Sequence, residues 1–304
     1  LARAWFRWFY LRPYAWTLRR ARSLARPYST RAQQLALPRW ILRRGCAEVL
    51  QRLKTFAPNL VVAAGPGAGG IAALAKREGW VNASLLAVQT DLDAQLLRVE
   101  REIDVYCVGS DDARALLIAC GASPNRVLLS GIPIDPAFSL AFDKSDIVQA
   151  LGLDPRRPIV LVMGGGAGRI PLEQIAQGLE RCGLPLQVLV VAGIDRDLQA
   201  RLESLRGRIA LQLHVFGWSD NVPELMAAAD LLVTRPGAVA TAEALAAGLP
   251  MVLTLTDAGL EESRARFLEQ RGVAVRARSC EDIPQLIHRL LKHPEKLSQM
   301  ARLA

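Results

Sequence analysis

The chain has 304 residues, of which 51% are hydrophobic, and its formal net charge is +9 at pH 7. This length predicts two domains of about 150 residues, each large enough for its own core. We expect no transmembrane helix in this chain.

The cysteines and histidines follow no pattern typical of metal ligands. The five cysteines include no CxxC pair, so we expect reduced thiols of a cytosolic protein rather than disulfides. His288 and His293 are off the i, i+4 spacing that places two ligands on one helix face, and His214 is remote from both in sequence. We therefore expect no metal site.

Residues 1–57 are predicted to be helical, with breaks at Pro13, Pro27 and Pro38. Residues 1–54 hold 13 Arg or Lys and a single acid, so they carry +12, which leaves −3 on the other 250 residues. Ten of the 17 aromatic residues lie among the first 56. Arginine together with tryptophan and tyrosine is typical of a segment in the headgroup layer of an anionic membrane.

Two other interpretations of residues 1–57 stay open. Clustered positive charge also suits nucleic acid, but no nucleic-acid-binding motif accompanies it here, and we expect no such partner. The segment can also be a pair of basic helices that packs on its own domain.

Beyond this segment, strands alternate with helices, which predicts parallel sheets of an α/β fold. The first sheet is predicted from Leu60–Ala64, Ser84–Thr90, Val105–Gly109 and Arg126–Gly131. A crossover begins at Ile132, and the predicted domain boundary lies between residues 142 and 143. The second sheet is predicted from Pro158–Met163, Gln187–Ala192, Leu211–Phe216, Asp230–Thr234, Met251–Thr256 and Val273–Arg276. Residues 283–304 are predicted to form a helical pair broken at Pro294.

Two of these strands run into a glycine turn and then a helix. Residues 164–168, four of them glycine, follow the strand that ends at Met163, and Pro236-Gly237 follow the strand that ends at Thr234. Backbone N–H groups at a helix start suit a diphosphate. Arg169 occupies the last glycine position of a GxGxxG motif, which disfavours a dinucleotide. Glu243 is placed to accept two sugar hydroxyls, although a structural corner with a capping carboxylate gives the same local pattern.

Several segments resemble one known family. LVMGGGAG, FGWSDNVPELMAAADLLVTRPG, TAEALAAGLPMV and GIPIDPAF are similar to the diacylglycerol glycosyltransferases, the monogalactosyl- and monoglucosyl-diacylglycerol synthases of glycosyltransferase family 28. These enzymes are relatives of the lipid-intermediate N-acetylglucosaminyltransferase of peptidoglycan synthesis. The resemblance extends from about Pro58 to the C-terminus and is strongest over Ile159–Val252.

The resemblance implies a GT-B fold, with two Rossmann-like, doubly wound domains. The acceptor domain would be residues 1–142, and the UDP-sugar domain would be residues 143–304, with residues 283–304 packing back on the first domain. The first strand and the glycine-histidine loop of the family's first domain have no counterpart where this chain opens.

Roles for individual residues follow from the same resemblance. Gly164–Gly166 would border the diphosphate and the acceptor hydroxyl, residues 218–221 the uracil, Gly237–Thr241 the diphosphate, and Glu243 the uridine ribose. Arg235 would add a full charge beside the diphosphate, unless it is a surface cation. Glu261 and Glu262 would contact the hexose, unless they are the charged first turn of a helix. The candidate donor-binding residues are thus Gly164, Gly165, Gly166, Trp218, Asn221, Arg235, Pro236, Gly237, Ala238, Thr241, Glu243, Glu261 and Glu262.

The implied reaction is an inverting transfer of a hexose from a UDP-sugar to a lipid such as diacylglycerol, at the cytoplasmic face of a membrane and without metal or cofactor. A general base must take the acceptor's proton. We expect Asp91 in this role, or else Asp93, since both follow a strand's carboxyl end; helix capping is the alternative for each.

Departures from the family leave two other functions open. Gly65-Pro66 stand where the family has His-Pro, and Leu260 lacks the amide found in the family's hexose loop. One alternative is a catalytically degenerate GT-B protein that binds membrane and nucleotide without transfer. The other is a UDP-sugar epimerase, which shares the two-domain layout.

Overall fold

The structure is a computed structural model that describes residues 46–92, 99–165, 170–254 and 260–304. Most of the basic, aromatic segment lies outside these residues, as do Asp93 and Gly166. The chain divides into two compact units, Leu1–Gly131 and Ile132–Ala304. This division falls earlier than the predicted boundary at residues 142 and 143. The crossover packs with the second unit, where the turn η3 (Pro136–Ser139) contacts the helix α11 (Ala238–Ala246) and buries Phe138.

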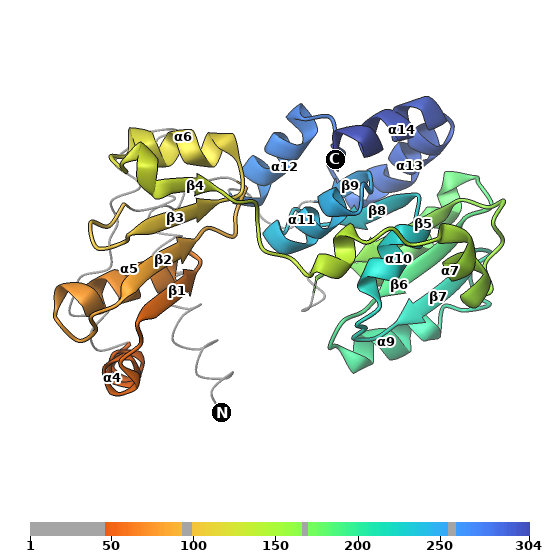
Figure 1. The fold of residues 1–304 in the computed structure, drawn as a ribbon. Helices are drawn as coiled ribbons and strands as arrows, with labels where there is room; N and C mark the ends of the chain where they lie inside the picture. Colours follow the sequence, from red (N-terminus) through yellow and green to blue (C-terminus); the bar gives the residue numbers. More distant parts are fainter. Residues whose placement is uncertain (1–45, 93–98, 166–169, 255–259) are drawn as a thin grey trace. The chain divides into compact units, whose positions relative to one another are not determined.

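The first unit is a parallel sheet with its strands in chain order, β1-β2-β3-β4 (Figure 1). Its elements are α4 (Ala47–Phe56), β1 (Leu60–Ala64), α5 (Pro66–Arg77), β2 (Ser84–Val88), β3 (Val105–Val108), α6 (Asp111–Ala119), η2 (Pro124–Arg126) and β4 (Val127–Leu129). All four predicted strands are present, three of them shorter at the carboxyl end. The described strands advance in one direction across the sheet, and side chains of α5 and α6 share one core with those of the strands.

The second unit is a six-stranded parallel sheet in the order β10-β9-β8-β5-β6-β7. Its strands are β5 (Ile159–Met163), β6 (Gln187–Val191), β7 (Gln212–Phe216), β8 (Leu231–Thr234), β9 (Met251–Thr254) and β10 (Ala274–Ala277). The chain winds from β5 out to β7, returns to place β8 beside β5, and continues to β10. This is the doubly wound order of a Rossmann fold, so the predicted topology is confirmed for this unit.

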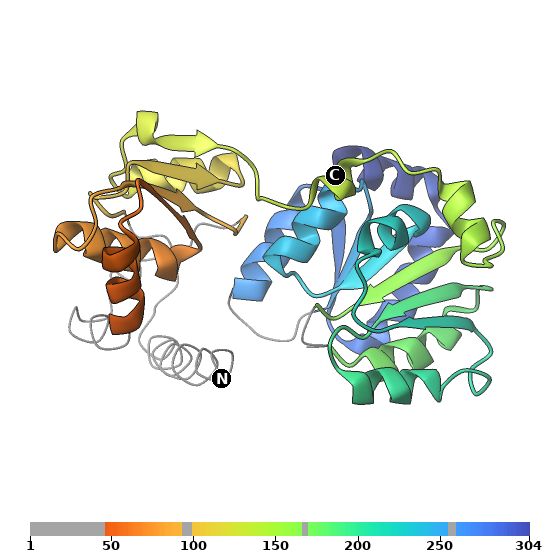
Figure 2. The same cartoon turned by 60° about the horizontal axis from the view of Figure 1, so that its bottom comes forward.

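Helices cover both faces of this sheet (Figures 1 and 2). They are α7 (Lys144–Ala150), α8 (Leu172–Gly178), η4 (Leu179–Cys182), α9 (Arg196–Glu203), α10 (Val222–Ala228), α11, α12 (Leu260–Gln270), η5 (Cys280–Asp282), α13 (Ile283–Leu291) and α14 (Pro294–Leu303). Strands β5, β6, β8 and β9 are buried along their whole length. Their unbroken runs of apolar residues are what a parallel sheet covered on both faces requires.

The C-terminal pair predicted over residues 283–304 is present as α13 and α14. Helix α13 packs on β9, β10, α8 and η4, and α14 packs on α13. The apolar side chains of Ile283, Ile287 and Leu290 enter the core of the second unit. The return of this segment to the first domain stays a prediction.

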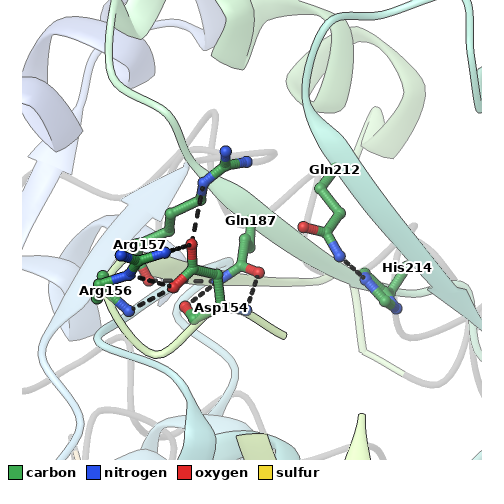
Figure 3. A network of polar contacts seen from close by, with 6 residues as sticks. All are labelled: Asp154, Arg156, Arg157, Gln187, Gln212 and His214. Atoms are coloured by element: carbon green, nitrogen blue, oxygen red, sulfur yellow. Dashed lines mark hydrogen bonds and ion pairs between the residues drawn. The ribbon is translucent and has the colours of Figure 1, made fainter. Parts of the chain in front are cut away.

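A buried glutamine ties the loop before β5 to the sheet (Figure 3). Gln187 is fully buried at the start of β6. Its Oε1 accepts from the backbone N–H of Asp154 at 2.7 Å, and its Nε2 donates to the carbonyls of Asp154 at 2.8 Å and Arg157 at 3.3 Å. A buried amide with partners at both ends fixes where β5 begins.

Candidate functional site

The candidate site lies where the second sheet changes its winding direction, between β5 and β8. In doubly wound sheets, ligands bind at the carboxyl ends of the strands at this switch point. Met163 and Thr234, the last residues of the two strands, are paired in register. The Thr234 hydroxyl also donates to the Met163 carbonyl at 2.9 Å. The two glycine turns predicted from the sequence therefore start side by side.

The first turn follows β5. Gly164 is buried, and Gly165 has a φ of +75°, a left-handed conformation that favours glycine. The turn thus brings bare backbone to the edge of the sheet, as the prediction for Gly164 and Gly165 requires. Gly166 lies outside the described residues.

The second turn leads from β8 into α11. Pro236 and Gly237 are buried, and the helix begins at the half-buried Ala238. Among the described residues, no side chain caps this helix start, whose N-cap is Gly237, so the N–H groups of its first turn are available to an acceptor. Thr241 does not supply one of these donors. Its N–H and its hydroxyl both donate to the Gly237 carbonyl, at 2.9 and 2.8 Å, and its side chain is fully buried.

Arg235 places its guanidinium against both turns. A Cβ built on Gly165 would lie 3.6 Å from Nε of Arg235, and one built on Gly237 would lie 3.5 Å from its Cζ. Nη1 donates to Glu261 Oε1 at 2.8 Å. Nε is buried and has no hydrogen-bond partner in the part of the chain that the structure describes. A buried donor without a partner is costly, and an anionic oxygen between the turns would satisfy it.

Glu243 presents a carboxylate near the start of α11. The side chain is half-buried, and the described residues provide it with no hydrogen bond or ion pair. Burial raises the pKa of Glu243 above its ordinary value, and the nearby charge of Asp135 raises it further. Two hydroxyl donors from a ligand would stabilise the ionised form. This arrangement is what the predicted ribose contact requires.

The two predicted hexose contacts have protein partners. Glu261 is buried in the first turn of α12 and pairs with Arg235. Glu262 pairs with Arg276 at 2.6 Å and with Arg266 at 3.5 Å. The arrangement around Glu262 is that of a charged first helical turn, the alternative noted for it above.

The predicted uracil-side residues lie at the carboxyl end of a different strand. Trp218 and Asn221 follow β7, and Asn221 stands directly before α10. Both are exposed, the tryptophan by 67%. No hydrogen bond among the described residues joins them to the glycine turns. The contact with uracil stays a prediction.

The predicted base Asp91 belongs to the first unit. It is half-buried and follows β2, as expected. The Ser110 hydroxyl at the start of α6 donates to the carbonyl of Leu92 at 2.8 Å, which anchors the chain next to Asp91. Its catalytic role stays a prediction, and Asp93 lies outside the described residues.

Two residues near the site were not predicted from the sequence. Asp135 lies close enough to Glu243 to raise its pKa, and its side chain accepts from Ala137 N at 2.9 Å. Arg264 of α12 donates to the Pro236 carbonyl of the second turn at 3.4 Å. Asp135 stands within the GIPIDPAF segment that carried the resemblance, whereas no local signal marks Arg264.

The described residues hold neither a cluster of metal ligands nor a membrane-spanning helix. No three His, Cys, Asp or Glu side chains gather there as a potential metal site. Among the helices that the structure describes, none has both the length and the hydropathy needed to span a bilayer.

Known structures resemble this chain in fold. The Anabaena protein HepE, solved in complex with UDP, superposes with a TM-score of 0.57 at 19% identity, over 86% of this chain and 76% of HepE. A putative UDP-N-acetylglucosamine 2-epimerase from Listeria monocytogenes gives a TM-score of 0.62 at 16% identity, over 89% of this chain and 76% of its own. At such identities the likeness concerns the fold alone, which is GT-B.

Sequence comparison gives the family. Residues 159–304 match the glycosyltransferase family 28 C-terminal domain. The processive diacylglycerol beta-glucosyltransferase of Bacillus licheniformis is 31% identical over 216 residues, which are 71% of this chain and 56% of the relative. The chain thus spans little more than half the length of such a relative. Residues 159–304 therefore form a C-terminal domain of the glycosyltransferase family 28 type.

Proposed function

We propose that this protein transfers a hexose from a UDP-hexose to a lipid acceptor such as diacylglycerol, with inversion and without a metal. The observation that carries the proposal lies at the switch point of the second sheet, where a helix start and the Glu243 carboxylate both lack a side-chain partner among the described residues. Donors for a diphosphate and an acceptor for sugar hydroxyls then lie on one helix. A nucleoside diphosphate sugar needs both.

The donor would bind through two contacts. Glu243 would accept the two hydroxyls of the uridine ribose. The diphosphate would lie against the N–H groups at the start of α11 and against Nε of Arg235, which is buried without a partner among the described residues. The name of the curated relatives supports glucosyl transfer, and HepE, which this chain resembles in fold, was solved with UDP bound.

The proposed reaction is an inverting displacement at the anomeric carbon. The acceptor hydroxyl attacks the anomeric carbon while the bond from that carbon to the diphosphate oxygen breaks. Asp91 takes the hydroxyl's proton, and the electron pair of the broken bond leaves with UDP. Backbone N–H groups and the Arg235 guanidinium stabilise the charge that develops on UDP, as preorganised donors do.

A lipid acceptor requires access to a membrane surface. Residues 1–57 would provide it, because arginine and tryptophan together suit an anionic headgroup layer. The protein would then be peripheral, on the cytoplasmic face where UDP-sugars are available. The diacylglycerol named for the Bacillus relatives supports this choice of acceptor.

An epimerase is the second candidate. The solved structures that this chain resembles include a putative UDP-N-acetylglucosamine 2-epimerase. An epimerase also needs the UDP site, but it needs no lipid. The family match and the curated relatives favour transfer. A degenerate protein would bind UDP without forming product.

The test is calorimetric titration of UDP into the full chain and into Glu243→Ala. Loss of two hydrogen bonds to a charged group should weaken UDP binding by about 10- to 100-fold. Glu203→Ala is the matched control, because Glu203 pairs with Arg206 on the surface of the same unit, and it should bind UDP like the wild type. Equal affinities for wild type and Glu243→Ala would remove Glu243 from the site, and a wild type that does not bind UDP would overturn the proposal.

A further inference from the structure

One ion pair connects α12 to the turn after β8. Arg235 Nη1 donates to Glu261 Oε1 at 2.8 Å, and the two side chains are only 23% and 10% exposed. A second contact joins the same two elements, because Arg264 Nη1 donates to the Pro236 carbonyl at 3.4 Å. Ion pairs this shielded from water are far less screened than surface pairs.

The pair determines where the guanidinium lies. Arginine has a long side chain with many rotamers, and fixing it costs conformational entropy. Here it lies against Gly165 and Gly237, within 3.6 Å of the positions where their Cβ atoms would be. Glu261 accepts a hydrogen bond from one of the five N–H groups of Arg235. The buried Nε of Arg235 has no partner among the described residues. The ion pair therefore holds a donor ready between the two turns.

We infer that Glu261 is a positioning residue, which acts on the donor's diphosphate through Arg235 and does not bind the hexose. The inference rests on the proposed UDP site. It assigns different tasks to two adjacent carboxylates, because Glu262 pairs with Arg276 and Arg266 instead. Placed in this way, Arg235 distinguishes nucleotides that carry a diphosphate from those that lack one.

The experiment is a double-mutant cycle on the full chain with Glu261→Gln, Arg235→Gln and the double variant. Affinities for UDP, UDP-glucose and uridine are measured by calorimetry, with ligand-observed NMR for the weakest. Glu269→Gln is the control, because Glu269 lies on the same helix and pairs with Arg276. It should bind all three ligands as the wild type does.

The positioning role predicts a specific pattern. Glu261→Gln should weaken UDP and UDP-glucose equally, by about tenfold, since the charge-assisted bond that holds the guanidinium is lost. Uridine binding should not change, whereas general damage to the fold would lower it as well. In the Arg235→Gln background, Glu261→Gln should have no further effect on UDP.

Three results would overturn the inference. Unchanged or tighter UDP binding by Glu261→Gln would show that Arg235 does not need Glu261. A loss for UDP-glucose that is absent for UDP would make Glu261 a hexose ligand. Additive effects in the double variant would show that Glu261 and Arg235 act on UDP binding independently. A wild type that binds no UDP would instead remove the proposed function itself, and the inference with it.

Discussion

At Glu243 the protein keeps a carboxyl group where ionisation is unfavourable. Burial raises its pKa, and the neighbouring charge of Asp135 raises it further. A folded-state pKa above the unfolded value means that the folded protein holds this proton to higher pH. Ionisation of Glu243 therefore costs stability as the pH rises from the unfolded pKa through the folded pKa, and that cost is absent below both. Such a cost is expected of a group kept for a ligand.

Replacing this carboxyl group by an amide should remove the cost. Glu243→Gln should melt above the wild type at about pH 8, by at most a few degrees, and the difference should vanish toward about pH 4. Thermal unfolding followed by circular dichroism across this pH range measures it. A Glu243→Gln variant that melts below the wild type at about pH 8 would show that the carboxylate is already satisfied in the folded protein.

At the scale of elements, polar side chains fix where the strands of the second sheet begin. Gln187 bonds the loop before β5 through both ends of its amide. Asp230, directly before β8, accepts from Ile159 N at 2.8 Å and from Lys144 Nζ at 2.5 Å. These contacts hold β5 and β8 at the register in which their carboxyl ends, and thus the glycine turns, coincide.

Loss of the buried amide should therefore destabilise the second unit. Gln187→Leu removes the partners of three backbone groups and should lower the free energy of unfolding by about 2–5 kcal/mol. Urea denaturation of the full chain measures it. Gln212→Leu is the control, because the half-buried Gln212 side chain bonds only the His214 ring, at 3.0 Å, within the part of the chain that the structure describes (Figure 3). Its loss should cost about 1 kcal/mol or less. Equal losses for the two variants would contradict the role of Gln187.

The four inner strands of the second sheet, β5, β6, β8 and β9, were predictable because they are mostly apolar runs that end close to a glycine or proline. The outer strands β7 and β10 carry polar residues such as His214 and Arg276. The strand ends were less predictable; β2, for example, ends at Val88, before the predicted Thr90. The crossover was harder to assign to a domain, because the turn η3, which holds the buried Phe138, contacts α11 about a hundred residues later in the chain.

Only the local part of the candidate site could be predicted from the sequence. The glycine turns and Glu243 belong to one local strand–turn–helix pattern, which the sequence displays. The ion pair of Arg235 with Glu261, and that of Glu262 with Arg276, depend on how α12 packs on its neighbours. The spacing of residues along the chain does not predict those contacts. The hexose role expected of both Glu261 and Glu262 therefore came from the family resemblance alone.

At the scale of the whole molecule, charge is concentrated at one end of the sequence. Residues 1–54 carry +12, and the other 250 residues carry −3. A basic residue near an anionic bilayer contributes about 1 kcal/mol. The proposed anchoring is thus electrostatic, and added salt should weaken it.

Co-sedimentation with anionic phospholipid vesicles tests this anchoring. Binding should fall as salt is raised and should be weak on neutral vesicles. Replacing Arg19 and Arg20 by glutamine should reduce the vesicle affinity by about thirtyfold, whereas the same change at Arg156 and Arg208, exposed in the second unit, should not. Association that ignores both salt and the first pair of substitutions would show that apolar insertion, and not charge, anchors the protein.

Product analysis tests the central claim most directly. The full chain is incubated with UDP-glucose, or another UDP-hexose, and with vesicles that contain diacylglycerol. The lipid products are then identified by mass spectrometry. Hexosyl-diacylglycerol and free UDP should form together in equal amounts, and Glu243→Ala should slow both. Conversion of UDP-N-acetylglucosamine to its 2-epimer without any glycolipid, or UDP-sugar binding without product for every hexose offered, would contradict the account.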